Sequence, residues 1–207
     1  MPEREDLCTI AWDPENEGIV YIDQTLLPGR CDLMRCTTVE DLARAIRRLE
    51  VRGAPALGIA GAMGVALAAV RSTETDPGQF QNEIRRAADL LRSTRPTAVN
   101  LAWGVDRVQR KVAMAASVAE AKELAVAEAN AVADEDELAC RRLGAFGEEL
   151  LPTACTVLTH CNAGALACRC WGTALGVIRS AVAAGKEIRV IACETRPLNQ
   201  EIGRAHV

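Results

Sequence analysis

The chain has 207 residues, of which 49% are hydrophobic and 25% charged, and its 24 Lys and Arg face 28 Asp and Glu. This balance is typical of a globular protein with a sizeable core and excludes a disordered chain. A net charge of −4 without a basic run argues against DNA or RNA as a partner.

The N-terminal residues 1–6 are acidic where a signal peptide would carry a positive flank and then an apolar run. The most apolar stretch, 54–70, contains Pro55 and is shorter than the roughly 20 apolar residues that a membrane-spanning helix needs. We therefore predict that 54–70 is a buried helix, and we expect a cytoplasmic protein without a membrane partner.

The first elements along the chain are predicted to be short strands. Residues 18–27 alternate in polarity and are followed by Pro28 and Gly29, a pattern typical of strands joined by a turn. A helix comes next, because Thr37 and Thr38 offer hydroxyl caps and apolar residues then recur at helical spacing. These apolar residues are Val39, Leu42, Ala43, Ile46 and Leu49, and the helix is expected to end near Gly53.

Further helices are predicted over 56–71, 79–93, 98–117 and 118–150. The last of them is rich in Ala and Glu. It is read either as a connection between two domains or as a surface helix of one domain. We place a domain boundary near residue 120.

From Cys155 onward the pattern becomes strand, small-residue turn, helix over 173–184 and strand over 188–193. Such a βαβ unit predicts a parallel sheet, with sites at the carboxyl ends of its strands. The predicted fold class is α/β, with a small β and helical domain over 1–120 followed by an incomplete Rossmann-like domain over 121–200.

One βαβ unit cannot complete a doubly wound sheet, so we expect the chain to be truncated at its C-terminal side. Residues 201–207 are predicted to be a non-native tail, because one set of codons for them matches a common sequencing-library adapter. The alternative is a genuine divergent tail.

Two arginines stand at predicted helix starts. Arg52, Gly53 and Ala54 precede a helix, and backbone N–H groups at a helix start together with a guanidinium suit a phosphate group. Arg95 precedes Pro96 in the same way and is a candidate ligand for phosphate or sugar hydroxyls. The alternative for each is an ordinary helix-initiating turn with a solvated arginine.

Cys161 follows a predicted strand end and enters a turn of small residues, a position that favours a reactive thiolate. An inert buried thiol is the alternative. The nine cysteines are odd in number and scattered, so no disulfide framework is predicted and packing is expected for the others. His160, Cys161, Cys168 and Cys170 lack the paired spacing of a zinc knuckle, so no metal site is predicted.

Five segments carry a resemblance to a known family. In order and approximate spacing, the chain resembles the methylthioribose-1-phosphate isomerases, which are aldose-phosphate isomerases related to ribose-1,5-bisphosphate isomerases and to regulatory subunits of initiation factor 2B. The segments are 21–28, 51–60, 93–103, 158–167 and 194–200, and the His-Cys-Asn-Ala-Gly that begins at His160 is among the more specific parts.

The resemblance implies a homodimeric enzyme of methionine salvage. It would convert an aldose 1-phosphate into a ketose phosphate without metal, nucleotide or other cofactor, and its only expected partner is a small sugar phosphate. The implied catalytic thiol is Cys161. The implied substrate-binding residues are Arg52, Gly53, Ala54, Arg95 and Gln200.

The family's aspartate acid/base lies on a later strand, and no residue of this sequence matches it, so the chain alone is expected to be inactive. Two alternatives remain open. One is an isomerase of another ribose or deoxyribose phosphate, since a single apolar substituent changes binding by only about 1–3 kcal/mol. The other is a non-catalytic regulatory subunit related to initiation factor 2B, for which Cys161 would be dispensable.

Overall fold

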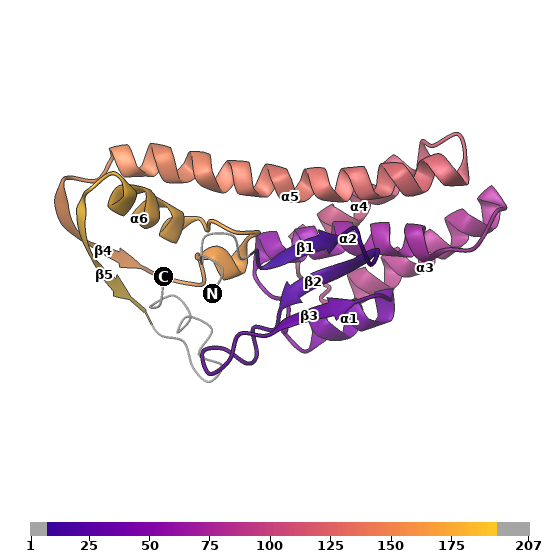
Figure 1. Cartoon of the computed structure of the whole chain (residues 1–207), viewed down its shortest axis with the longest axis horizontal. Helices are drawn as coiled ribbons and strands as arrows, with labels where there is room; N and C mark the ends of the chain where they lie inside the picture. The colour runs from indigo at the N-terminus through magenta and orange to yellow at the C-terminus, as the bar shows by residue number, and fades with distance from the viewer. Residues whose placement is uncertain (1–7, 194–207) are drawn as a thin grey trace.

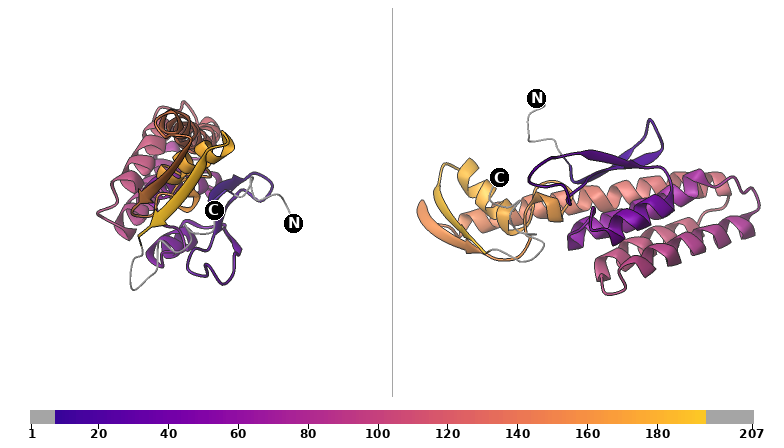
Figure 2. Two further views of the ribbon diagram at one scale, coloured as in Figure 1. Left: turned by 90° about the vertical axis from the view of Figure 1, so that its left-hand side faces the viewer. Right: turned by 90° about the horizontal axis from the view of Figure 1, so that it is seen from below.

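A computed structural model describes residues 8–193 of the chain. It confirms a mixed helix and strand architecture. A small sheet lies against a group of helices at one end, and a short parallel pair of strands lies at the other end (Figure 1). The long helix α5 (Val118–Glu149) runs along both parts, and the molecule is elongated in Figure 1 and in the right-hand view of Figure 2.

The N-terminal sheet has the order β1-β2-β3 and is antiparallel throughout. Its strands are β1 (Ile10–Asp13), β2 (Gly18–Ile22) and β3 (Leu33–Cys36). The predicted short strands are confirmed, but burial does not alternate along β2, in which four of the five residues are buried. The side chains on the inner face join the helical core, and they are Ile10, Ile19, Tyr21 and Cys36.

Four helices form the body behind this sheet. They are α1 (Val39–Arg47), α2 (Ala54–Arg71), α3 (Pro77–Thr94) and α4 (Val99–Ala113). Thr38 caps α1 as predicted, since its side chain accepts a hydrogen bond from the backbone N–H of Asp41 at 3.2 Å. The remaining helix boundaries lie within four residues of the predicted ones, except that α1 ends at Arg47 and not near Gly53.

Helix α2 is the centre of the core. It is the one helix of the described residues that is long and apolar enough to cross a membrane, and 78% of it is buried inside the protein. It packs against both α4 and α5, which explains why it is apolar on all sides. The prediction of a buried helix at this place is confirmed.

The second part follows α5. It contains the parallel strands β4 (Ala154–Thr159) and β5 (Glu187–Ala192), joined through α6 (Ala174–Ala183), so the predicted βαβ unit is confirmed. Helix α6 packs on α5. Ser117 caps the start of α5 at the expected domain boundary, which stays a prediction.

The N-terminal segment is tied to the loop that follows β4. Thr9 donates its backbone N–H to the carbonyl of Arg169 at 2.7 Å and its hydroxyl to the carbonyl of Ala165 at 2.9 Å. Cys8 and Cys170 form a disulfide between the same two segments. The prediction that no disulfide forms is therefore wrong, and the cause is a sequence separation of 162 residues, which gives no local signal.

Candidate functional site

The start of α2, the junction of α3 and α4, and the loop after β4 meet around a cavity of about 530 Å³. Five residues predicted from the sequence to form the site line this one cavity. They are Arg52, Gly53, Ala54, Arg95 and Cys161. The sixth, Gln200, lies outside the described residues. The roles of these residues remain proposals, but the structure brings them together from segments far apart in sequence.

Gly53 allows two walls of the cavity to touch. Its backbone has a φ of 103°, which other residues rarely adopt. A Cβ atom there would lie 2.4 Å from the Cα of Ala167, so a side chain cannot be placed without moving the loop after β4. Glycine at position 53 therefore allows the backbone before α2 to lie in close contact with the backbone of the loop after β4.

The lining is cationic. Arg52 and Arg95 are partly buried, none of the described lining residues is acidic, and neither arginine has an ion-pair partner within 8–193. Burial lowers the pKa of the Arg52 guanidinium, which nevertheless stays charged at neutral pH. Two unpaired guanidinium groups facing one cavity favour an anionic ligand.

Two helices begin at this cavity, and their first residues are part of its lining. Gly53 precedes α2, Ala98 precedes α4, and neither helix has a side-chain cap. The free N–H groups and the positive dipole end of each helix therefore face the same space as the arginines. This combination of donors is suited to a phosphate group.

Cys161 brings a nucleophile and proton donor to the cavity. It follows β4 directly and has a φ of 64°, an uncommon conformation for a residue with a side chain. Its side chain is exposed, so the alternative of an inert buried thiol is wrong. His160 is also exposed but is not part of the lining. An accessible thiol beside an anion site can exchange protons with a bound phosphorylated molecule.

Gln24 is a residue whose role sequence analysis missed. It is 1% exposed, and its side-chain amide donates to the carbonyl of Arg52 at 3.2 Å and to the carbonyl of Leu166 at 2.8 Å. It thus holds the arginine segment against the loop after Cys161. Its neighbours Asp23 and Thr25 are polar as well, so no local pattern distinguishes Gln24. Asn100 and Thr173, which also line the cavity, were not singled out either.

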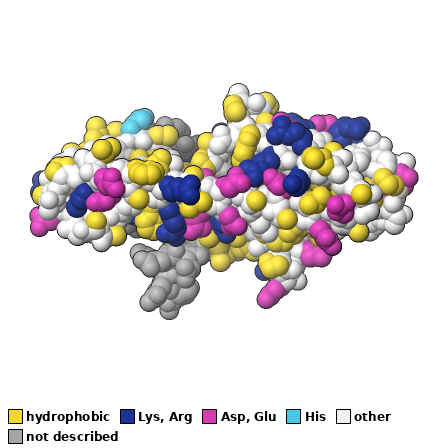
Figure 3. Space-filling view, turned by 90° about the horizontal axis from the view of Figure 1, so that it is seen from above, with side chains coloured by type: hydrophobic (Ala, Val, Ile, Leu, Met, Phe, Trp, Pro, Cys, Tyr) yellow, Lys and Arg dark blue, Asp and Glu magenta, His cyan; other side chains and the backbone are white. Residues whose placement is uncertain are grey.

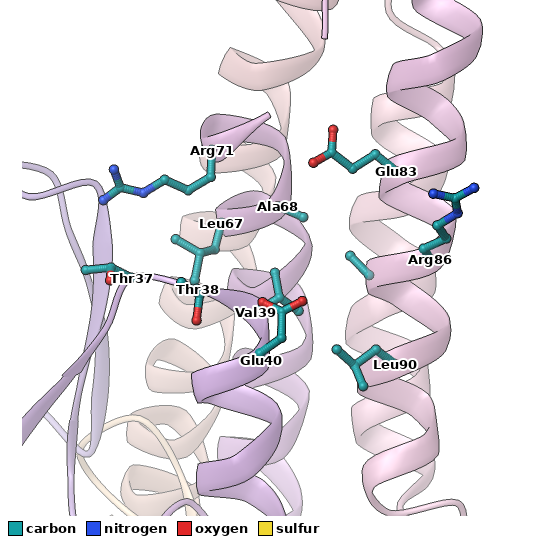
Figure 4. A pocket seen from close by; sticks show the side chains of 11 residues that line it. Thr37, Thr38, Val39, Glu40, Leu67, Ala68, Arg71, Glu83, Arg86 and Leu90 are labelled. Atoms are coloured by element: carbon teal, nitrogen blue, oxygen red, sulfur yellow. The ribbon is translucent and has the colours of Figure 1, made fainter. Parts of the chain in front are cut away.

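A second cavity of about 460 Å³ lies between α1, α2 and α3 (Figure 4). Its charges are mixed, with Glu40 and Glu83 beside Arg71 and Arg86. Arg71 extends away from Glu83 and donates to the carbonyls of Asn16 and Glu17 (Figure 4). The two carboxylates distinguish this cavity from the first, whose described lining contains no acidic residue.

Comparisons with known proteins place these features in a family. Residues 50–206 match the model of the initiation factor 2 subunit family. A 5-deoxyribose 1-phosphate isomerase from Moorella thermoacetica is 50% identical over 198 residues, which are 95% of this chain and 56% of the relative. A methylthioribose-1-phosphate isomerase from Anaeromyxobacter dehalogenans is 47% identical over 97% of this chain and 56% of its own length.

Solved structures agree with these relatives. A 5-methylthioribose 1-phosphate isomerase from Pyrococcus horikoshii has a TM-score of 0.84 at 33% identity, over 91% of this chain and 61% of its own. A structure described as the delta subunit of translation initiation factor eIF-2B from A. fulgidus has a TM-score of 0.86 at 53% identity, over 94% and 56%. The chain thus spans little more than half the length of the proteins it matches.

Proposed function

The chain belongs to the initiation factor 2 subunit family, and on that premise we propose that it forms the N-terminal part of an aldose–ketose isomerase acting on 5-methylthioribose 1-phosphate. The single observation that carries the proposal is the cavity that joins Arg52, Arg95 and two helix starts to the Cys161 thiol. The product is 5-methylthioribulose 1-phosphate. The names of the relatives from Anaeromyxobacter and Pyrococcus support this substrate.

The cavity offers separate positions for holding the substrate and for moving hydrogen. The 1-phosphate is bound by Arg52, Arg95 and the N–H groups at the starts of α2 and α4. The same phosphate blocks the anomeric oxygen, so the sugar ring must be opened with assistance before hydrogen moves between the first two carbons. Cys161 provides one acid/base group at that place. Because the thiol is held beside the bound sugar, proton transfer does not require a separate encounter between the two in solution.

The second acid/base group is absent from this chain, since the aspartate implied by the family resemblance matches none of its residues. We therefore propose that the 207 residues alone have no appreciable isomerase activity. We also propose that the enzyme of full length is cytoplasmic and homodimeric, and that Gln200 contacts the sugar. Sedimentation equilibrium of the full-length protein tests the dimer.

The test uses the chain extended to the length of its relatives, with ketose phosphate formation followed by NMR. Cys161→Ser is expected to lower kcat by about 10²–10⁴-fold, the usual contribution of an acid/base group. Arg52→Ala and Arg95→Ala are expected to raise KM, because each loses a charge-assisted bond of about 1.5–3 kcal/mol. Arg86→Ala, in the second cavity, is the matched control and leaves both constants unchanged.

Turnover that survives Cys161→Ser at the original rate would overturn the assignment of the thiol. Wild-type protein without any turnover would favour the regulatory subunit instead, since such a protein needs only the phosphate ligands. A second substrate, 5-deoxyribose 1-phosphate, is favoured by the name of the relative from Moorella. The ratio of kcat/KM for the two sugars decides between them.

A further inference from the structure

Three potential metal ligands converge at the junction of α5 and the loop after β4. They are Asp136, Cys140 and Cys168, and their ligand atoms all lie within 4.8 Å of one another. Asp136 and Cys140 are one helical turn apart on α5 and therefore share a face, while Cys168 comes from the distant loop. Zinc sites commonly combine two ligands that lie four residues apart on a helix with a third ligand from another segment.

The thiols of this cluster are buried, with Cys140 4% exposed and Cys168 1% exposed. Both are free, and neither takes part in the Cys8–Cys170 disulfide. Their apolar surroundings are thin, because among residues 8–193 this small core contains Ala167 and the edge residue Trp171 besides them. A carboxylate beside two buried thiols is costly to place in a core, and a bound cation would remove that cost.

The neighbouring backbone orients the carboxylate of this cluster. The N–H of Arg169 donates to Oδ2 of Asp136 at 2.8 Å. Hydrogen bonds that fix ligand atoms from behind are the usual surroundings of metal ligands in proteins.

The charge near the cluster also suits a bound cation. Two thiolates and a carboxylate carry three negative charges, so a divalent ion leaves a net charge of −1. Arg141 and Arg179 lie over the Trp171 ring, with their guanidinium carbons 4.5 and 5.3 Å from its centroid. Trp171 packs against the two cysteines, which brings these arginines to the same part of the fold, although Arg141 also pairs with Glu137 at 2.8 Å.

We propose that Asp136, Cys140 and Cys168 bind one Zn²⁺ ion, which fixes α5 to the loop that lines the candidate active site. Zinc accepts sulfur and oxygen ligands at about 2.3 and 2.0–2.2 Å, so tetrahedral ligands lie roughly 3.8 Å or less apart. The three ligand atoms lie within 4.8 Å of one another, so they draw together by at most about 1 Å when they bind the ion. The fourth position is left for water. The ion has a structural role, and the proposed isomerisation does not depend on it chemically.

The experiment measures metal in the 207-residue chain purified under reducing conditions without chelators. Elemental analysis is expected to find one zinc per chain, and Co²⁺ substitution is expected to give thiolate charge-transfer absorption and the visible bands of a tetrahedral ion. Cys140→Ser and Cys168→Ser are expected to lose both signals. Asp136→Asn is expected to weaken binding at least tenfold. Cys31→Ser, which removes an exposed free thiol, is the control and keeps both signals.

X-ray absorption of the wild-type chain provides a reading that does not depend on the folding of any variant. It is expected to find two sulfur ligands per zinc, whereas four sulfurs or none would overturn the assignment. The proposal also fails if the reduced chain holds no zinc, or if the Cys140→Ser/Cys168→Ser double variant holds as much as wild type. It fails equally if mass spectrometry of protein handled without oxidant finds Cys140 joined to Cys168.

Discussion

Cys36 and Tyr21 place two ionisable groups on the buried face of the small sheet. Tyr21 donates its hydroxyl to Oε2 of Glu50 at 2.7 Å, and Cys36 is 1% exposed. Burial raises the pKa of the Cys36 thiol from 9.0 to about 11 and, with the bond to Glu50, raises that of Tyr21 as well. Both groups therefore favour the folded protein only while they keep their protons.

This arrangement predicts a loss of stability in alkali. Below pH 9 the contribution of Cys36 is fully present, because neither state has released the proton. Between pH 9 and about 11 the unfolded chain releases it first, so the free energy of unfolding falls until the folded thiol also ionises. One proton accounts for at most about 1.4 kcal/mol per pH unit.

Cys36→Ala is expected to flatten the dependence of the unfolding free energy on pH in this window, as measured by urea denaturation at several pH values. Cys31→Ala, which removes an exposed thiol, leaves the slope unchanged. Burial and the bond to Glu50 still raise the pKa of Tyr21 in Cys36→Ala, so the part of the decline that belongs to Tyr21 is reduced there but not removed, because Cys36 also raises that pKa. An equal slope in wild type and Cys36→Ala would contradict the prediction.

At the residue scale, sequence analysis could find the groups whose surroundings are local. Arg52 stands just before a helix start that the sequence itself reveals, and Cys161 follows a recognisable strand. Arg95 was also expected at a helix start, whereas it is the C-terminal cap of α3 and lies three residues before Ala98, the cap of α4. Gln24 could not be found in this way. Its function depends on the carbonyl of Leu166, 142 residues further along, and nothing near Gln24 indicates that pairing.

At the scale of the elements, the crossing of α2 and α4 determines how the helical body packs. A Cβ atom on Gly104 would lie 1.9 Å from the carbonyl oxygen of Gly58, so the two backbones touch where the helices cross. Such close contact needs glycine, because a methyl group has no space between the two main chains.

Gly104→Ala is therefore expected to destabilise the protein by about 1–3 kcal/mol, the usual cost of overpacking, despite the better helix propensity of alanine. The measurement is urea denaturation followed by circular dichroism. Gly29→Ala is the matched control, because the nearest atom to its Cβ is at 3.6 Å, an ordinary contact. Equal stability of the two variants would show that the helices separate at little cost.

The helices themselves could be predicted well, because apolar periodicity and capping residues are local signals. The end of α1 could not be predicted from these signals. The apolar repeat continues through Leu49 and predicted a helix up to Gly53, whereas the helix ends at Arg47. Leu49 has a φ of 65°, and the segment turns there so that Val51 enters the core. Apolar spacing cannot distinguish a helical turn from a loop that buries the same residues.

At the scale of the whole molecule, apolar side chains gather at the end that holds the parallel strands. Leu158 is 71% exposed, and Val182 and Ile191 are each 54% exposed, on β4, α6 and β5 respectively. On the face that carries α5, by contrast, basic and acidic side chains are interspersed (Figure 3). A paired sheet with uncovered apolar residues tends to associate with other molecules.

We therefore expect the 207-residue chain to associate as its concentration rises, as measured by sedimentation velocity. Leu158→Thr combined with Ile191→Thr is expected to reduce this association. Met114→Thr removes a residue that is 81% exposed on a different element and is the control. A monomeric wild-type chain at high concentration would contradict this expectation.

The βαβ unit was predictable from the sequence, whereas the exposure of its apolar side chains depends on what packs beside the unit.

The hydrogen bonds of Thr9 also determine the sequence in which parts of the chain can fold during synthesis. Their acceptors are carbonyls of Ala165 and Arg169, so they cannot form until most of the chain has left the ribosome. At ~5–20 residues per second, the 156 residues between Thr9 and Ala165 correspond to a delay of roughly 8–31 s. During that interval β1 can pair with β2 and the helical body can assemble, whereas Thr9 does not yet have the acceptors of its two hydrogen bonds. Among residues 8–193, one of the segments made first is thus among the last to reach its final contacts.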